Sequence, residues 1–259
     1  MRLGAGTLAA AISDAVAPFG LNLVGVARPT AYDALVPAAY RLRDATGPLV
    51  SVVVIGNGGG AFWSAFRAHA RRHPDFATRP HPLDDFTRVV MEEAALPALA
   101  RYGVAGVLRL PFDRGEPSLS FVHLAEAAGL GRRSLLGVLV HPEFGPWMAL
   151  RGALLLDVAT SAPRPSAGFG PCAACVERPC IGACPTGAVT ASGWDVERCT
   201  SYRVGAAGRC DEACHARVAC VYGRAHRYPR DAIAYHQGRA RAVMEQHRAA
   251  LPVSGPAGS

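Results

Sequence analysis

The sequence contains no lysine, and all 27 of its basic residues are arginine. It has no cysteine before residue 172 and no apolar run near the 18 or so residues that a membrane-spanning helix needs. Only 18% of its residues are charged, against 50% that are hydrophobic. These shortages argue against a disordered chain, a membrane protein and a miniature protein held by disulfides. We expect a packed protein of one large or two modest domains in 259 residues.

The first 20 residues lack a convincing export signal, because Asp14 interrupts their apolar stretch. We therefore expect a cytoplasmic protein. The absence of lysine is typical of a GC-rich coding bias and is not evidence for phosphate recognition by arginine. The formal charge of +7 is unevenly distributed, since residues 1–197 carry 17 Arg against 16 acids and residues 198–259 carry 10 Arg against 4 acids.

Helical and strand patterns alternate over residues 1–160, which predicts an α/β layer. The expected helices cover 7–18, 61–72, 82–102 and 118–128, and the expected strands cover 21–26, 49–55, 104–110, 136–140 and 148–158. Pro97 should kink or break the third helix.

Residues 161–170 are rich in Pro, Gly, Ser and Ala and predict a linker. Residues 171–230 form a second, cysteine-dense domain. Residues 231–259 read as a terminal helix and a flexible tail, with Arg239, Arg241 and Arg248 on the polar side of the helix.

All eight cysteines lie between residues 172 and 220, and the first four follow the pattern C-x2-C-x4-C-x3-C-P. In two-cluster ferredoxins the cysteine of the Cys-Pro pair ligates the other cluster. Applying this crossing predicts two 4Fe-4S clusters. Cluster one takes Cys172, Cys175, Cys180 and Cys220, and cluster two takes Cys184, Cys199, Cys210 and Cys214.

Three other uses of these cysteines stay open. Two zinc sites would also need eight thiolates, but zinc modules usually pair two C-x2-C knuckles and only one x2 spacing occurs here. Disulfides are disfavoured in a reducing compartment. A single cluster with four idle cysteines is the third alternative. The second group, C-x3-C-x5-C without a following proline, departs from the ferredoxin pattern, so the assignment of Cys214 and Cys220 depends on the crossing alone.

Several segments resemble the epoxyqueuosine reductases. These are CIGACPTGAV at 180–189, WDVERCTSY at 194–202, AEAAGLGRRSLLGVLVHPEFGPW at 125–147 and LNLVGVAR at 21–28. The resemblance to this family, and to the related corrinoid reductive dehalogenases, implies an α/β (α+β flavin-reductase-like) cobalamin-binding domain beside a two-cluster ferredoxin-like domain. It implies electron transfer through the clusters to cobalamin. The residues it places in the corrinoid pocket are Gly129, Gly131, His141, Pro142, Gly145 and Trp147.

The sequence departs from the family at two places in the site. Where the family has a Gly-Lys-Asn element, this chain has Ser134, Leu135 and Leu136. Where the family has its acidic proton donor, this chain offers Asp113 or Glu116 at a shifted spacing. The helical-repeat domain that grips transfer RNA in the family has no counterpart after Cys220. We therefore expect a small-molecule substrate and no nucleic-acid partner.

Weaker signals are interpreted as structural. The glycines of residues 56–60 could cradle a phosphate, but they lack the P-loop lysine and the dinucleotide fingerprint, which favours a tight turn. His69, His73 and His81 are expected at the surface, and Trp63 in the core or a pocket wall. His141 could be an axial ligand, although a His before Pro at a strand end is more often structural.

Bound metal clusters would change the interpretation of the excess positive charge in residues 198–259. Two clusters of about −2 each would reduce the formal charge from +7 to about +3. The arginines after residue 197 then fit a counter-charge and a docking surface for an acidic electron donor such as a flavodoxin or ferredoxin. Two other functions remain, namely a non-catalytic electron carrier or cobalamin-handling protein, and a zinc-stabilised nucleic-acid module.

Overall fold

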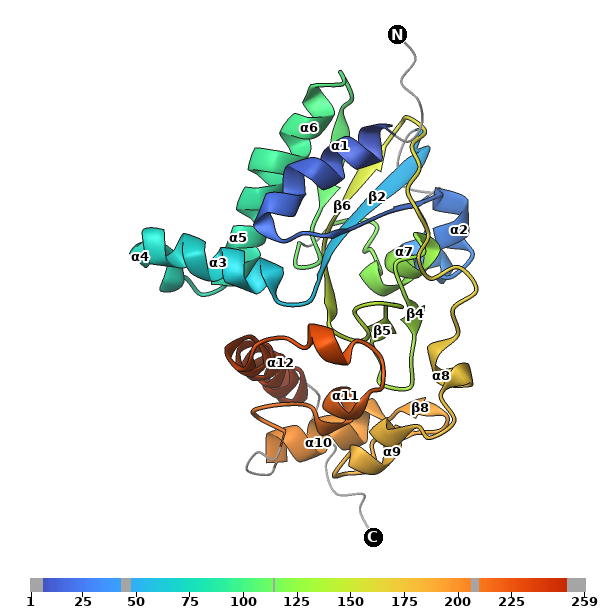
Figure 1. Ribbon diagram of the computed structural model, residues 1–259, viewed down its shortest axis with the longest axis vertical. Coiled ribbons are helices and arrows are strands. Elements are labelled where there is room, and N and C mark those ends of the chain that lie inside the picture. The colour runs from blue at the N-terminus through green and yellow to red at the C-terminus, as the bar shows by residue number, and fades with distance from the viewer. Residues whose placement is uncertain (1–6, 43–47, 114, 206–209, 251–259) are drawn as a thin grey trace.

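A computed structural model describes residues 7–42, 48–113, 115–205 and 210–250, and it centres on a four-stranded sheet (Figure 1). The strand order is β1-β2-β6-β3, and all three pairings are antiparallel. The strands are β1 (Leu23–Ala27), β2 (Ser51–Gly58), β6 (Met148–Leu156) and β3 (Gly106–Arg109). The predicted mixture of helices and strands is confirmed. The pairing makes the layer α+β, as the family resemblance implied, whereas helix–strand alternation by itself usually indicates parallel strands.

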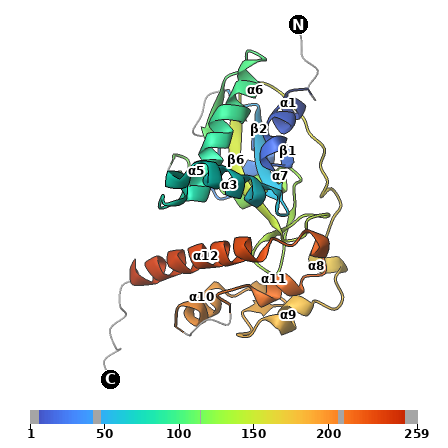
Figure 2. The same cartoon turned by 60° about the vertical axis from the view of Figure 1, so that its left-hand side comes forward.

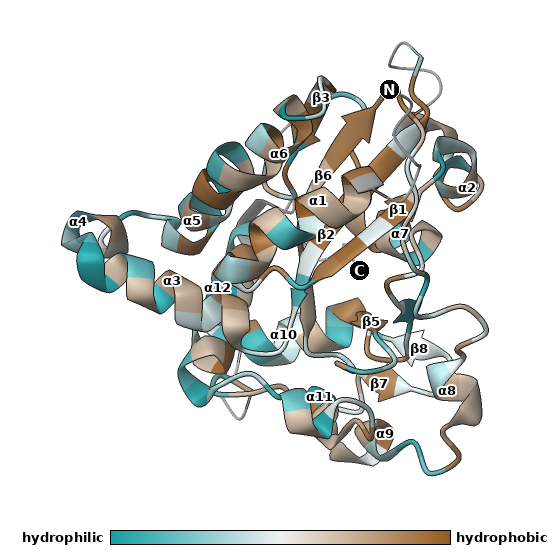
Figure 3. Cartoon of the chain, turned by 45° about the horizontal axis from the view of Figure 1, so that its top comes forward, coloured by the Kyte–Doolittle hydropathy of each residue, from teal (hydrophilic) through white to brown (hydrophobic). Residues whose placement is uncertain are grey.

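Helices cover both faces of the sheet because β2 is hydrophobic on both sides. All eight residues of β2 are buried, and its neighbouring valines point to opposite cores. Val53 and Ile55 join one cluster, and Val52 and Val54 join the other. The strand β6 is mostly apolar as well (Figure 3).

The first core lies under α1 (Thr7–Val16), α3 (Ala61–Arg72), α4 (Pro74–Ala77), α5 (Pro82–Val90) and α6 (Leu96–Ala100). The second lies under α2 (Pro29–Asp33) and α7 (Phe121–Ala127). A short 3-10 helix, η1 (Ala17–Phe19), follows α1, and a second one, η2 (Ala38–Tyr40), comes after α2.

Two predicted elements differ from the structure. The third helix, expected to kink or break at Pro97, does not break there: it runs from α5 through a π-helical turn, η3 (Met91–Ala95), into α6. Pro97 lies two residues after the π-helical turn, and such a local irregularity accommodates a residue that lacks the N–H of a regular helix. The strand expected over 136–140 is only β5 (Leu139–Val140), which pairs with β4 (Arg132–Arg133). Between them Gly137 adopts φ +73°, and the chain turns as a hairpin tip.

The cysteine-rich half is built from short elements around a small core. They are α8 (Pro171–Ala174), α9 (Pro179–Ala183), β7 (Val189–Thr190), β8 (Gly193–Trp194), α10 (Val196–Gly205), α11 (His215–Ala219) and η4 (Arg224–His226). The last helix, α12 (Arg230–Ala250), crosses between the sheet layer and α10 (Figure 2). Its first turn packs Ala232 into the core beside α1, α3 and α5.

The connection over residues 161–170 is fastened to the sheet layer. The guanidinium of Arg164 donates to the carbonyl of Ala127 at 2.7 Å, and the N–H of Ser166 donates to the carbonyl of Gly129 at 3.0 Å. Ser166 is completely buried. The segment is therefore irregular in backbone but bound along its length, and the proposed boundaries at 160 and 170 remain a prediction. None of the described helices combines the length and apolar character needed to cross a bilayer.

Candidate metal centres

The eight cysteines line two separate cavities, four to each. Cys184, Cys199, Cys210 and Cys214 line a cavity of about 210 Å³ below α12. Cys172, Cys175, Cys180 and Cys220 line a smaller one of about 20 Å³. No cysteine lines both. All eight thiols are free, and the two sets coincide with the two ligand groups predicted from the crossing rule.

Short helices and turns present these thiols. Cys180 lies in the first turn of α9 and Cys184 at its C-cap, where the chain leaves the helix before Pro185. Arg178, which lies between Cys175 and Cys180, adopts φ +44° and is the sole described non-glycine residue with positive φ. This left-handed conformation costs of order 1 kcal/mol for such a residue. It turns the chain sharply enough for Cys175 and Cys180 to face one cavity.

The hairpin tip between β4 and β5 lies between the two cavities. Leu136 lines both of them, while Leu135 lines the smaller and Val138 the larger. The backbone N–H of Leu135 points at the sulfur of Cys172, 3.4 Å away. The resemblance described above aligns these two leucines with the Lys and Asn expected of the reductases. In this chain they place apolar side chains and one N–H donor against the thiols.

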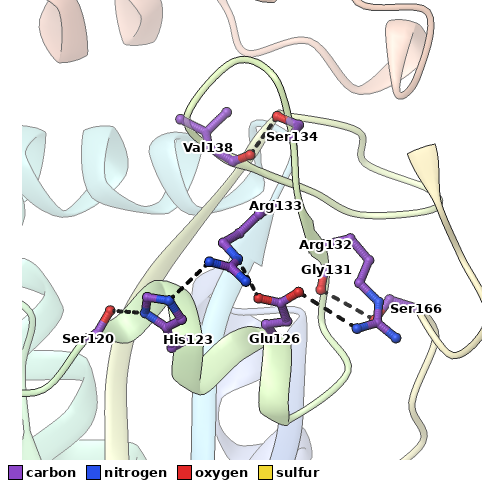
Figure 4. A network of polar contacts seen from close by, with 9 residues as sticks. All are labelled: Ser120, His123, Glu126, Gly131, Arg132, Arg133, Ser134, Val138 and Ser166. Atoms are coloured by element: carbon purple, nitrogen blue, oxygen red, sulfur yellow. Dashed lines mark hydrogen bonds and ion pairs between the residues drawn. The ribbon is translucent and has the colours of Figure 1, made fainter. Parts of the chain in front are cut away.

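Polar contacts at the base of the hairpin hold this tip in place (Figure 4). Glu126 of α7 forms ion pairs with Nε of Arg133 at 2.8 Å and with the guanidinium of Arg132 at 3.7 Å. His123 bridges Ser120 and Arg133, with its Nδ1 2.6 Å from the Ser120 hydroxyl. The hydroxyl of Ser134 closes the tip by donating to the carbonyl of Val138 at 2.7 Å. Burial and the charge of Arg133 lower the pKa of His123, so the imidazole is neutral near pH 7.

The thiols of each set are coupled electrostatically. Burial and then the neighbouring Cys220, Cys172 and Cys175 raise the pKa of Cys180. Burial, Cys214 and Cys199 likewise raise the pKa of Cys210. Four thiolates cannot share such a space without a cation among them, because each disfavours ionisation of the others. The arrangement therefore suits a bound metal group, which supplies the missing positive charge.

Cys184 differs from the other thiols. Burial by itself would raise its pKa, but the hydroxyl and N–H of Thr186 and the N–H groups of Val189 and Ala188 lower it. The hydroxyl of Thr186 lies 3.6 Å from the sulfur. Trp194 also contributes a side-chain hydrogen bond to Cys199. Donors of this kind stabilise negative charge on sulfur and are known to tune the potential of thiolate-bound clusters.

Arg203 is a residue of this site that the sequence did not single out. It lies one turn after Cys199 on α10, lines the larger cavity and is 8% exposed. Its guanidinium donates to the carbonyl of Gln237 on α12 at 2.8 Å, and its Nε is buried without a hydrogen-bond partner among the described residues. The i, i+4 spacing of Cys199 and Arg203 is the signal that could have identified it.

Four cysteine thiols line each cavity, and this donor set suits a 4Fe-4S cluster or a four-cysteine zinc site. In the described ranges, no group of three or more His, Cys, Asp or Glu side chains is arranged to hold a single metal ion.

The residues expected to form a corrinoid pocket are instead packed against other parts of the chain. A Cβ on Gly129 would lie 2.8 Å from the Cβ of Arg164, and the carbonyl of Gly131 lies 3.5 Å from the hydroxyl of Ser166. Both glycines thus accommodate the connection between the two halves. Their assignment to a corrinoid pocket stays a prediction.

The His141–Trp147 segment contains a tight turn that the side chain of His141 stabilises. The buried imidazole of His141 accepts, at Nδ1, the backbone N–H groups of Glu143 and Phe144 at 3.1 and 3.2 Å. Pro142 lies within this turn, and burial lowers the pKa of His141. Gly145, at φ +56°, meets the backbone of Tyr222 so closely that a Cβ would lie 2.2 Å from its carbonyl oxygen. Trp147 is 1% exposed, and with Gly145 it packs against the chain after Cys220.

The two candidate proton donors lie apart from the thiols. Asp113 forms an ion pair with Arg88 at 2.5 Å, and Glu116 is exposed. Neither lines a described cavity. A proton donor must lie within hydrogen-bonding distance of its acceptor on the substrate, so the assignment of either carboxyl to that role stays a prediction.

The weaker sequence signals have structural roles. Gly58 lies against the ring of Phe144, where a Cβ would come within 2.3 Å, and Gly59 turns the chain at φ +67°. His69 stacks on His73 and contacts Phe76 and Phe86, and His81 contacts Arg239. Trp63 is buried in the core, as expected.

Known proteins resemble both the sequence and the fold. The chain is 32% identical to epoxyqueuosine reductase of Listeria monocytogenes over 127 residues, which cover 44% of this chain and 32% of that protein. It thus spans about a third of the length of this curated relative. No family model matches the sequence. The resemblance predicted from the motifs is confirmed over this part of the chain.

Solved structures share the fold at low sequence identity. The C. elegans B12-trafficking protein CblC, a human MMACHC homologue, has a TM-score of 0.59 at 12% identity, covering 92% of this chain and 94% of that one. Epoxyqueuosine reductase from Streptococcus thermophilus has a TM-score of 0.57 at 13% identity, with 84% and 66% covered. A catabolic reductive dehalogenase bound to 3-bromo-4-hydroxybenzoic acid has a TM-score of 0.52 at 19% identity, with 95% and 36% covered.

The expectation that nucleic acid is not a partner stays a prediction.

Proposed function

We propose that the chain is an iron–sulfur redox protein that carries two 4Fe-4S clusters and passes electrons for reductive chemistry on a small molecule. The observation that carries this proposal is the division of eight free cysteines into two cavities of four thiols each. A bound cubane supplies a one-electron carrier whose potential depends on hydrogen bonds to sulfur, local charge and exposure.

The chain's own residues would make the two clusters unequal. The larger cavity has Arg203, the indole of Trp194 and the donors around Cys184, all of which favour added negative charge. The smaller cavity has the N–H of Leu135 and a backbone donor from Tyr222. We infer that the cluster held by Cys184, Cys199, Cys210 and Cys214 has the higher reduction potential and is reduced first.

The surface beside the smaller cavity fits an acidic electron donor. Val176, next to Cys175, is 93% exposed, and Arg224, whose charge acts on Cys220, is also exposed. An apolar centre bordered by arginine favours a partner with an acidic surface, such as a flavodoxin or ferredoxin. Electrons would then enter at Cys172, Cys175, Cys180 and Cys220.

Cobalamin binding is a second candidate function, favoured by the fold shared with the B12-trafficking protein. Gly145 and Trp147 of the expected corrinoid pocket pack against the segment around Tyr222 and Tyr228. We therefore derive no step through cobalt. Such binding would require this segment to move away from Trp147. A cytoplasmic location stays a prediction, and a transfer RNA is an alternative class of substrate.

Metal content and spectroscopy of cysteine variants test the proposal. The anaerobically purified protein should contain about eight iron per chain, from two clusters of four. Cys180→Ser and Cys220→Ser should leave the same single cluster with the same EPR spectrum. Cys210→Ser and Cys214→Ser should leave the other one. Each pair is the matched control for the other.

Three outcomes would contradict parts of this proposal. Zinc in place of iron, in a colourless protein, would favour the nucleic-acid module and overturn the redox function. If Cys220→Ser and Cys214→Ser exchanged their spectra, the ligand groups would be wrong although the clusters were present. If cobalamin titrated anaerobically gave no change in its absorption spectrum, the corrinoid function would fail, and the two-cluster carrier would stand.

A further inference from the structure

A small polar cavity lies between the sheet layer and the start of α12, away from both sets of cysteines. Its volume is about 10 Å³, and β2, β6, α3 and α12 all contribute to its wall. The polar side chains that line it are Asn57, Trp63, Arg151, Tyr228 and His236. None of these has a role in the proposed electron transfer.

The cavity contains a buried positive charge. Arg151 of β6 is 8% exposed, and burial lowers its pKa, yet a guanidinium remains protonated near pH 7. Its Nε donates to Oδ1 of Asn57 at 2.8 Å, and its Cζ lies 4.6 Å above the ring of Phe62. Among the described residues, no ion pair and no second hydrogen bond involves Arg151. Burying a guanidinium in this way costs several kcal/mol unless a counter-charge is near.

An unpaired hydroxyl faces the same space. Tyr228 is 6% exposed, and its hydroxyl is buried with no hydrogen bond within 3.5 Å in the part of the chain that the structure describes, although the side chains of Asn57 and Arg217 lie near enough to act on it. A buried O–H without an acceptor is unfavourable. Arg217 adds a second positive charge, with its Cζ 5.3 Å from the ring of Tyr228. The Tyr228 hydroxyl therefore lacks an acceptor beside the guanidinium of Arg151.

No carboxylate supplies that acceptor. Asp84 acts on Arg151 only at a distance, since it neither lines the cavity nor forms an ion pair with Arg151 within 4.0 Å among the described contacts. Asp231 lies nearby, but it accepts from Trp63 at 2.9 Å and pairs with Arg67 at 3.2 Å. The charge of Asp84 therefore offsets that of Arg151 from a distance, and among the described residues no carboxylate oxygen contacts the guanidinium of Arg151.

We propose that the cavity between Arg151, Tyr228 and Asn57 is a binding site for a monovalent inorganic anion of halide size. The volume admits about one atom-sized guest, which excludes phosphate, sulfate and carboxylic acids. A halide accepts hydrogen bonds from the guanidinium and the phenol together and neutralises the buried charge. Because a water molecule also fits by size but lacks the charge, the test must distinguish the two.

Anomalous diffraction from crystals grown or soaked in sodium bromide tests the site directly. We expect a bromide peak within hydrogen-bonding distance of the Arg151 guanidinium and the Tyr228 hydroxyl, with weaker or no peaks at exposed arginines. Density at this position with no anomalous signal would show a water and overturn the proposal. The experiment needs no variant and does not depend on the metal content of the protein.

Thermal unfolding gives an independent readout in solution. Raising sodium chloride at constant ionic strength, balanced with sodium gluconate, should raise the midpoint of the full chain in a saturable manner. Tyr228→Phe should weaken the apparent chloride affinity about tenfold, the equivalent of one lost hydrogen bond to an ion. Tyr235→Phe, which alters a neighbouring half-buried tyrosine outside the cavity, is the matched control. Equal chloride responses in the two variants would contradict the site.

Discussion

Acidification should destabilise the protein through His236 on α12. This imidazole lies among Tyr228, Tyr235 and Trp63, and burial together with the charges of Arg151 and Arg217 lowers its pKa from 6.5 to about 4. Between these two values the unfolded chain binds a proton that the folded chain does not, so stability falls as the pH falls. The linkage relation gives a loss of about 2 kcal/mol between pH 7 and pH 5 from this residue alone.

The perturbation is His236→Phe, which retains an aromatic ring but cannot bind the proton. The assay is urea-induced unfolding of the anaerobic protein in low-halide buffer at pH 7, 6 and 5. We expect the wild type to lose about 2 kcal/mol more than the variant over this range, while the m-values stay equal. Comparison at each pH cancels the acid sensitivity that both proteins share. Parallel stability curves for the two proteins would refute the assignment of a buried neutral imidazole at this position.

Two further predictions concern the larger cysteine cavity and the packing of the chain after Cys220 against Gly145. Arg203→Met should lower the reduction potential of the cluster held by Cys184, Cys199, Cys210 and Cys214, on the order of 50 to 100 mV for about 1 to 2 kcal/mol of lost Coulombic energy. Arg198→Met, on the same helix but with its side chain 58% exposed, should leave it unchanged in an EPR-monitored titration, and equal shifts would contradict the role of Arg203. Gly145→Ala should destabilise the fold by roughly 2 to 4 kcal/mol, because its Cβ would meet the Tyr222 carbonyl at 2.2 Å. Gly168→Ala, at φ +72° with no atom within 4 Å, should cost about 1 kcal/mol for backbone strain alone, and similar losses for both in chemical denaturation would show that the close packing at Gly145 is unimportant.

Much of the fold could be predicted from local patterns. The helix over 61–72 and the buried strand after residue 49 were anticipated because apolar spacing and β-branched runs are local properties. The hairpin tip at 134–138 was not, because its conformation depends on contacts with two cavities formed by distant cysteines. The antiparallel order of the sheet also required pairing between β2 and β6, which lie about 90 residues apart.

The candidate site, like the fold, was predicted from the sequence only in part. The cysteine spacing predicted two groups of four, and the structure brings the same two groups together. Three glycines of the expected corrinoid pocket, Gly129, Gly131 and Gly145, lie against Arg164, Ser166 and Tyr222, and their role toward a cofactor stays a prediction. Sequence could not distinguish a glycine that makes room for a cofactor from one that makes room for the chain itself.

The sequence by itself determined the number and grouping of the thiols, because ligand spacing within a short loop fixes which sulfurs can converge. It also determined the apolar character of both faces of the central strand. Only the tertiary structure decided what surrounds those thiols, including Arg203, Trp194 and the hairpin tip with Leu135 and Leu136. It alone revealed the buried charge of Arg151 beneath α12, since burial and missing partners arise from contacts between segments that lie far apart in the chain.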